Sequence, residues 1–214
     1  MAIYFDIETA PLEREKLDAV MPVFKARANI KDPVKIEADI QEKIAGFIAD
    51  AALDASTGRV VAFGWAVDGG DVKGIAYPDA KDEGDILKFA WDTFTDERGV
   101  IIQDIIGHNS NKFDIPFLVR RSRIVGVDVP PTVLTWSRGR MYLDQHFKDT
   151  MDAWACGTTD KIKLDTLAKC LGVGAKNGDG ANFFETLKSD PRKALDYLKN
   201  DVELTRACAL RLGL

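Results

Sequence analysis

The chain lacks several features that identify common classes of protein. It has no apolar run long enough to cross a bilayer and no basic start of a signal peptide, which predicts a cytoplasmic protein without membrane contact. Its three cysteines, Cys156, Cys170 and Cys208, are odd in number and lack metal-ligand spacing, so we expect small buried thiols rather than a disulfide framework. The two histidines, His108 and His146, fall in no metal-ligand pattern either. These absences argue against secreted, membrane-spanning and zinc-binding classes.

A strongly basic composition is also missing. The net charge of −5 argues against indiscriminate binding of duplex nucleic acid through a basic surface. Local basic groups remain, and each could line a phosphate track or form a solvated face. These groups are Arg120, Arg121 and Arg123, then Arg138 and Arg140, then Lys161 and Lys163. The glycine-rich stretch 172–180 does not follow a strand and open a helix, as dinucleotide-binding loops do, so we interpret it as a mobile connection.

The apolar sequence that is present suffices for one folded domain. With 214 residues and 46% hydrophobic content, the chain can bury a substantial core, and we expect a single domain over residues 1–214. Apolar runs predict strands at 2–8, 59–67, 72–77, 100–106 and 147–151. Helical periodicity predicts helices at 85–94, 163–171, 182–188 and 191–212. A further helix is expected to begin near Asp114, with Ile124 among the residues that face the core.

Four carboxylates occur in three separate signatures. Asp6 and Glu8 end the first predicted strand within the run FDIET, and strand residues two apart project from the same face. Asp114 opens a helix, where negative charge is favoured. Tyr197 and Asp201 lie four apart in the last predicted helix and therefore share one of its faces. Taken singly, these residues are also explained as strand-end acids, a helix N-terminal acid and a core-edge tyrosine with a solvated aspartate.

The three signatures together predict a metal site. Carboxylates gathered in one partly buried place repel one another and need a counter-charge to ionise. Hard divalent cations such as Mg²⁺ and Mn²⁺ supply that charge and prefer oxygen ligands. Two such ions about 3.5–4 Å apart are the arrangement used for in-line phosphoryl displacement.

The order FDIET, HNSNKFDIPFL and YLKND resembles the motifs of the DEDDy group of 3′–5′ exonucleases. The chain is most similar to the proofreading exonuclease domain of family B DNA polymerases and its free-standing relatives, over nearly its whole length. A sister group has histidine five residues before the last aspartate, where this chain has Asp196, so the tyrosine subtype is favoured. The resemblance implies an α/β ribonuclease H-like fold, with a central mixed sheet of about five or six strands flanked by helices.

The resemblance also implies roles for matching residues. The metal ligands would be Asp6, Glu8, Asp114 and Asp201, holding two Mg²⁺ or Mn²⁺ ions. Tyr197 is the remaining catalytic candidate, and because its unperturbed pKa of about 10 makes it a poor base, we expect it to orient the attacking water. The candidate substrate-binding residues are Thr9, His108, Asn109 and Phe113. Phe113 is also explained as a core residue.

Three functions remain open at the level of sequence. The first is hydrolysis of single-stranded DNA from the 3′ end, which releases nucleoside 5′-monophosphates and is favoured because no acid is missing. The second is the same reaction on RNA, since a two-metal site reads phosphate, and only a contact at the 2′ carbon would discriminate. The third is a non-catalytic nucleic-acid-binding or scaffold domain with the same fold. A separate replication or repair protein is a further candidate partner.

The stretch between the first two strands, residues 11–54, departs most from a minimal exonuclease. It is charged and helix-prone, with apolar residues on one helical face at Ile36, Ile40, Ile44, Phe47 and Ile48. We expect a helical insertion whose apolar stripe packs onto the domain. The alternative is a wall or lid beside the active site, with Phe24, Lys25 and Arg27 reaching a strand end.

Overall fold

The computed structural model describes residues 1–137, 140–178 and 180–214. Its central feature is a five-stranded sheet in the order β3-β2-β1-β4-β7. The strands are β1 (Ala2–Pro11), β2 (Gly58–Val67), β3 (Lys73–Ala76), β4 (Asp104–Gly107) and β7 (Phe147–Asp149). β1, β2 and β3 pair antiparallel, whereas β4 runs parallel to both β1 and β7. The predicted mixed sheet of an α/β fold is therefore confirmed.

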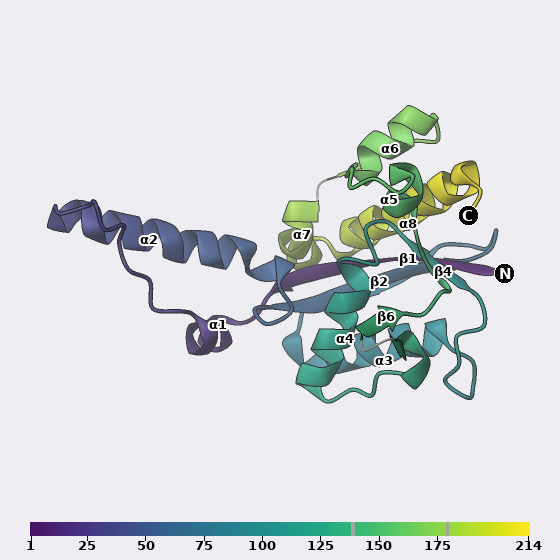
Figure 1. Cartoon of the computed structure of the whole chain (residues 1–214), viewed down its shortest axis with the longest axis horizontal. Helices are drawn as coiled ribbons and strands as arrows, with labels where there is room; N and C mark the ends of the chain where they lie inside the picture. The colour runs from purple at the N-terminus through teal and green to yellow at the C-terminus, as the bar shows by residue number, and fades with distance from the viewer. Residues whose placement is uncertain (138–139, 179) are drawn as a thin grey trace.

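Helices cover both faces of this sheet (Figure 1). They are α3 (Glu83–Phe94), α4 (Asp114–Val125), α5 (Thr150–Ala155), α6 (Leu164–Leu171), α7 (Phe183–Ser189) and α8 (Pro191–Leu212), with the short 3-10 turns η2 (Ala80–Asp82), η3 (Pro131–Val133) and η4 (Gly180–Asn182). α3 and α4 pack on one face, over a buried cluster that includes Phe5, Phe63 and Ile105. α8 lies on the other face, with α5, α6 and α7 around it. None of the helices within the described ranges is both long and apolar enough to cross a bilayer.

α8 has the bounds that the sequence predicted. The side chain of Asp190 caps its first turn and Pro191 takes its first position, as both residues favour. Gly64 of β2 lets this helix approach the sheet closely, because a side chain at that position would lie 2.8 Å from Leu198. The close approach brings the exposed end of β1 and the middle of α8 together.

Three predicted strands are too long: 72–77 exceeds β3 by one residue at each end, and the strands predicted at 100–106 and 147–151 are cut short by side chains that bind the backbone. Residues 100–103 form no strand, since the carboxylate of Asp96 accepts a hydrogen bond from the backbone N–H of Val100 (3.0 Å) and turns the chain there. β7 stops at Asp149, whose side chain accepts a hydrogen bond from the backbone N–H of Met151 (2.8 Å) and caps α5. Strand propensity at both places is overridden by side-chain bonds to the backbone.

Several single-residue predictions are also corrected. Ile124 is 58% exposed near the end of α4 and does not face the core. Cys156 and Cys170 are exposed, so Cys208 alone is the buried thiol expected among the cysteines. A hairpin of β5 (Leu134–Ser137) and β6 (Arg140–Leu143) was not predicted. Arg138, in one of the basic groups, lies outside the described residues.

The basic group on α4 contains a structural ion pair. Arg121 is 4% exposed and donates to the carboxylate of Glu83 at 2.6 Å and to the backbone oxygen of Ala55 at 3.0 Å. A buried charge of this kind requires such partners. Arg121 therefore lines no phosphate track.

The insertion between β1 and β2 consists of α1 (Arg14–Val20), α2 (Pro33–Asp50) and the short turn η1 (Ala51–Leu53). α2 projects from one end of the sheet and does not lie across it (Figure 1). Within α2, which the structure describes in full, Asp39 is the only buried residue. The prediction that its apolar stripe packs onto the domain is thus wrong for most of the helix.

The segment before α2 packs along it. The rings of Phe24 and Phe47 meet edge to face with centroids 6.0 Å apart. Arg27 and Lys43 both pair with Asp39 at 3.0 Å, and Lys43 also donates to the backbone oxygen of Lys25. Phe24, Lys25 and Arg27 thus make their contacts within the insertion itself, and these contacts give no support to the alternative in which they reach the end of a nucleic acid strand.

Candidate active site

An acid cluster forms where β1 runs past the end of β4. β4 pairs only with residues 2–4 of β1, so Asp6 and Glu8 emerge beyond the last parallel pair, at the sheet edge where α/β proteins place their sites. A bulge between Glu8 and Thr9 alters the register with β2, as often occurs beside active sites. Carboxylate oxygens of Asp6, Glu8 and Asp201 all lie within 4.8 Å of one another. Three predicted ligands from two distant elements therefore meet.

Asp114, the fourth predicted ligand, lies beside this group at the start of α4. Its side chain is 4% exposed, and its Oδ1 accepts a hydrogen bond of 3.3 Å from the backbone N–H of Ile7. Its charge contributes to raising the pKa of Asp6. All four acids thus share one site, with Asp114 at its margin.

A tight turn between β4 and α4 places Asp114. Asn109 adopts a left-handed conformation (φ 60°), and the buried carboxylate of Asp149 accepts hydrogen bonds from the backbone N–H groups of Asn109 (2.8 Å) and Asn111 (3.0 Å). Gly107 is required before the turn, because a side chain there would lie 2.4 Å from Ser110. Asp149 is accordingly a positioning residue for the start of α4.

Lys176 enters the acid cluster from the glycine-rich stretch. Its ammonium donates to Oδ2 of Asp201 at 2.6 Å and to the hydroxyl of Tyr197 at 3.0 Å. The stretch lies close against the site, since a side chain at Gly178 would lie 2.7 Å from the Tyr197 ring. The expectation of a plain mobile connection is therefore replaced by a segment that supplies a cation to the carboxylates.

The acids are strongly perturbed. Burial raises the pKa of Asp6 and of Glu8 well above the usual range, and neighbouring carboxylates raise both further. Burial also raises the pKa of Asp114 to about 7, although backbone N–H groups oppose the shift. For Asp201, burial raises the pKa and Lys176 opposes it. The ammonium of Lys176 alone is thus insufficient to neutralise four ionised carboxylates.

The donor set fits divalent metal ions. All four side chains offer hard oxygen ligands, which Mg²⁺ and Mn²⁺ prefer. Oδ1 of Asp201 is buried and has no hydrogen-bond partner in the described part of the chain, although its Oδ2 is paired with Lys176. A buried carboxylate oxygen without a donor is costly, and a bound cation would satisfy it.

The candidate substrate-binding residues differ in their surroundings. Both ring nitrogens of His108 are bonded within the protein, to the hydroxyl of Thr150 (2.8 Å) and the backbone oxygen of Ile162 (2.9 Å), which leaves neither free for a phosphate in this conformation. Asn109 lines a cavity beside Asp6. Thr9 and Phe113 line a different cavity beside Glu8. Phe113 also packs against Phe117, so it is both a packed residue and part of a cavity wall.

The acid cluster lies between these two cavities. The cavity beside Asp6 has a volume of about 640 Å³ and carries the basic side chains of Lys161, Lys163 and Lys176. The cavity beside Glu8 has a volume of about 560 Å³ and mainly apolar walls. Gly180 lines both cavities.

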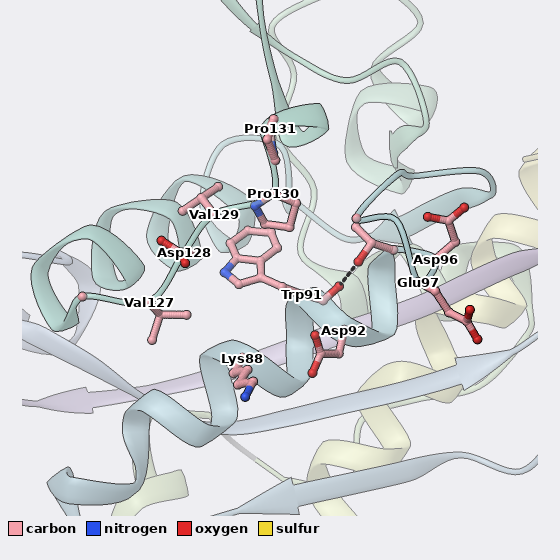
Figure 2. Close-up of a pocket in the computed structure, with 13 residues that line it drawn as sticks. Lys88, Trp91, Asp92, Asp96, Glu97, Val127, Asp128, Val129, Pro130 and Pro131 are labelled. Carbon is pink, nitrogen blue, oxygen red and sulfur yellow. Dashed lines mark hydrogen bonds between the residues drawn. The ribbon is translucent and has the colours of Figure 1, made fainter.

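A larger cavity of about 800 Å³ lies elsewhere, between the end of α3 and the segment 126–131. Figure 2 shows its carboxylates pointing in different directions rather than converging. They belong to Asp92, Asp96, Glu97 and Asp128. Among the described residues, only Asp6, Glu8 and Asp201 form a group that could hold a metal ion. The larger cavity therefore lacks the geometry for the predicted chemistry.

Comparison with known proteins bears on the fold. No protein-family model matches the sequence, and no curated protein is significantly similar to it. The solved structure of the family B DNA polymerase from the hyperthermophilic archaeon Pyrobaculum calidifontis is similar, with a TM-score of 0.61 and 20% identity. The similarity covers 99% of this chain and 24% of the polymerase chain, so this chain spans about a quarter of that protein's length. The fold is ribonuclease H-like.

Sequence reasoning missed two residues of the site. Lys176 lies in the glycine-rich stretch 172–180, which was interpreted as a connection. It is the one basic residue of that stretch, and this was the available signal. Asp149 was assigned to a strand, although an aspartate before Thr150 and Met151 is a helix-cap pattern. Both act through contacts distant in sequence, which local patterns do not encode.

Replacing Lys176 by methionine is expected to tighten binding of Mn²⁺, because the ammonium competes with a cation for Asp201. We expect the dissociation constant to fall by about tenfold, as one neighbouring charge is worth about 1–2 kcal/mol at a partly exposed site. Without metal, the variant should unfold at a lower temperature than the wild type. Titration calorimetry with Mn²⁺ measures the first effect, and unchanged or weaker binding would contradict the competition.

Proposed function

We propose that the protein is a two-metal-ion 3′–5′ exonuclease that removes nucleotides from single-stranded DNA and releases nucleoside 5′-monophosphates. The observation that carries this proposal is the convergence of Asp6, Glu8 and Asp201, with Asp114 beside them. The tyrosine subtype is supported by Tyr197, one helical turn before Asp201 and within reach of the same ammonium. DNA is proposed over RNA because the chain is similar in fold to a DNA polymerase.

The carboxylates, Tyr197 and Lys176 have different roles in the proposed reaction. Two bound Mg²⁺ or Mn²⁺ ions would supply stabilisation of charge at the scissile phosphate and activation of water. The four carboxylates would hold these ions between the two cavities. Burial raises the pKa of Tyr197, so its hydroxyl stays protonated and orients water by hydrogen bonding rather than accepting a proton as the base. Lys176 would offer positive charge to a phosphate once metal occupies Asp201.

Replacing Tyr197 by phenylalanine is expected to lower kcat by about 10- to 100-fold, the cost of a misplaced reactant. Metal affinity should stay unchanged, because the hydroxyl is no metal ligand in this assignment. Single-turnover rates and Mn²⁺ titration of the same preparation measure the two effects. A variant that loses metal binding together with activity would contradict an orienting role.

The proposed activity is tested by a denaturing-gel time course with 5′-labelled single-stranded DNA. An RNA of the same sequence runs in parallel, and each strand is incubated with Mg²⁺, with Mn²⁺ and with chelator. A metal-dependent ladder that shortens from the 3′ end is expected, faster for DNA than for RNA. If RNA is shortened faster than DNA, the protein is an exoribonuclease and the proposed DNA substrate is wrong. Absence of shortening with either metal would overturn nuclease action and favour a binding or scaffold domain.

A further inference from the structure

The apolar cavity beside Glu8 joins the insertion to the acid cluster. It lies between the end of β1, the end of α2 with η1, and the start of α7. Its walls include Thr9, Pro11, Ile48, Leu53, Phe113 and Phe184. Glu8 lines the same cavity, so a ligand held there contacts the edge of the metal site.

The insertion supplies one wall of this cavity. Ile48 is half-buried, whereas Leu53 is 64% exposed, an unusual state for a leucine that lines a cavity. The wall is anchored, because the hydroxyl of Thr57 donates to the backbone oxygen of Ala51 (2.9 Å) immediately before β2. The projecting insertion therefore presents a fixed apolar surface at the site rather than a loose loop.

The opposite wall is aromatic. The ring of Phe184 contacts two cations, the guanidinium of Arg59 at 5.1 Å from its centroid and the ammonium of Lys188 at 4.6 Å. These contacts fix the ring as a wall. Phe113 is partly exposed and directed to the cavity from the start of α4. The cavity thus has mostly apolar and aromatic sides, and its polar side chains, among the described residues, are those of Glu8, Thr9 and Glu185.

The two cavities beside the acids differ in their basic residues. The cavity beside Asp6 carries Lys161, Lys163 and Lys176 together with the acids Asp6 and Asp165, and its lysines suit phosphate, whereas no basic residue in the described part of the chain lines the cavity beside Glu8. The cavity beside Glu8 suits an aromatic base, and base contacts with apolar and aromatic side chains stabilise single strands. A paired base would bring its partner and its hydrogen-bonding edge against apolar walls, at an energetic cost.

We infer that the insertion, through Ile48 and Leu53, forms the outer wall of a binding site for the unpaired base at the 3′ end of a nucleic acid strand. The site rests on the proposed nuclease function and adds to it the origin of selectivity for unpaired ends. The insertion is then part of substrate recognition, through its last turn rather than through its projecting helix.

The inference is tested with Leu53→Ala and with oligonucleotides whose 3′-terminal nucleotide either carries a base or is abasic. Wild-type kcat/KM should be about tenfold higher with the base present, the effect expected of one stacked base. In Leu53→Ala this ratio should fall to about 2, because only the base contacts the wall. Val34→Ala is the matched control, since Val34 lies on α2, is 78% exposed and is outside the cavity.

Binding is measured without turnover in an Asp6→Asn background with chelator. A strand with 2-aminopurine at its 3′ end should lose fluorescence on binding, and adding Leu53→Ala should reduce the quenching and weaken binding by about tenfold. Val34→Ala should leave both unchanged.

The two proposals fail differently. If the wild type cleaves both strands equally, or if Leu53→Ala slows both equally, the base site is overturned and the nuclease stands. If the wild type cleaves neither strand with Mg²⁺ or Mn²⁺, the nuclease is overturned. The fluorescence titration then decides the base site alone, and unchanged quenching in Leu53→Ala overturns it.

Discussion

Replacing Asp6 by asparagine is expected to lower the rate of strand shortening by about 1000-fold or more, because one anchor of the charge-stabilising site is lost. A carboxylate oxygen of Asp6 lies within 4.8 Å of oxygens of Glu8 and Asp201, so the substitution removes one charged ligand from the group that would hold the metal ions. The fold should persist. Removing one of several repelling charges is expected to leave the metal-free protein as stable as the wild type or more so. Initial rates on labelled DNA and thermal unfolding with chelator measure the two effects.

Asp128→Asn is the matched control for this substitution. Asp128 lines the larger cavity of Figure 2 and lines neither of the two cavities beside the acid cluster. Wild-type activity is expected for this variant. If Asp128→Asn loses most of its activity while Asp6→Asn keeps full activity, the two-metal assignment is wrong and the larger cavity is the active site.

Replacing Asp114 by asparagine is expected to stabilise the metal-free protein by about 2–4 kcal/mol above pH 7 and by little at pH 4. Burial raises the pKa of Asp114 from its usual value of about 3.9 to about 7. The folded state therefore binds this proton more tightly than the unfolded state. The stability contributed by the protonated form is complete below pH 4 and is lost as the pH rises through about 7. Asparagine has no proton to lose, so the difference from wild type grows over that window.

Urea unfolding of both proteins at a series of pH values measures this difference. The comparison between variants matters, because Asp39, Asp54 and Asp96 have lowered pKa values and give the opposite pH trend in both proteins. Magnesium provides a second measurement at pH 8. It should stabilise the wild type more than Asp114→Asn, since a ligand that binds the folded state adds to its stability. A pH-independent difference would show that Asp114 is ionised in the folded state.

Local sequence predicted the elements that have strong end signals. α8 was predicted with both bounds, and Ser189 or Asp190 as cap with Pro191 at the first position marked its start. The two strands predicted at 59–67 and 72–77, with the glycine-containing turn 68–71 between them, correspond to the antiparallel pair β2 and β3. Where a side chain diverts the backbone, as Asp96 and Asp149 do, propensity gave strands that are too long.

The insertion shows the limit of periodicity. An apolar stripe on one face of α2 predicts that something covers it, and it does not identify what does. The structure covers the stripe in part with the preceding segment, through Phe24 and Arg27, and leaves the helix projecting from the sheet. An apolar stripe that is covered by other residues of the insertion has the same sequence pattern as a stripe that packs on the rest of the domain.

The sequence by itself determined which residues could bind metal, because carboxylates at Asp6, Glu8, Asp114 and Asp201 occupy recognisable strand and helix positions. Apolar periodicity and helix caps, which are local properties, also indicated the separate strands and helices, and the family resemblance implied their arrangement in a mixed α/β sheet. Tertiary structure alone decided which oxygens converge, that Lys176 pairs with Asp201, and that the end of the insertion lines a cavity beside Glu8. Those features depend on contacts between residues far apart in the chain, whose energies no local pattern contains.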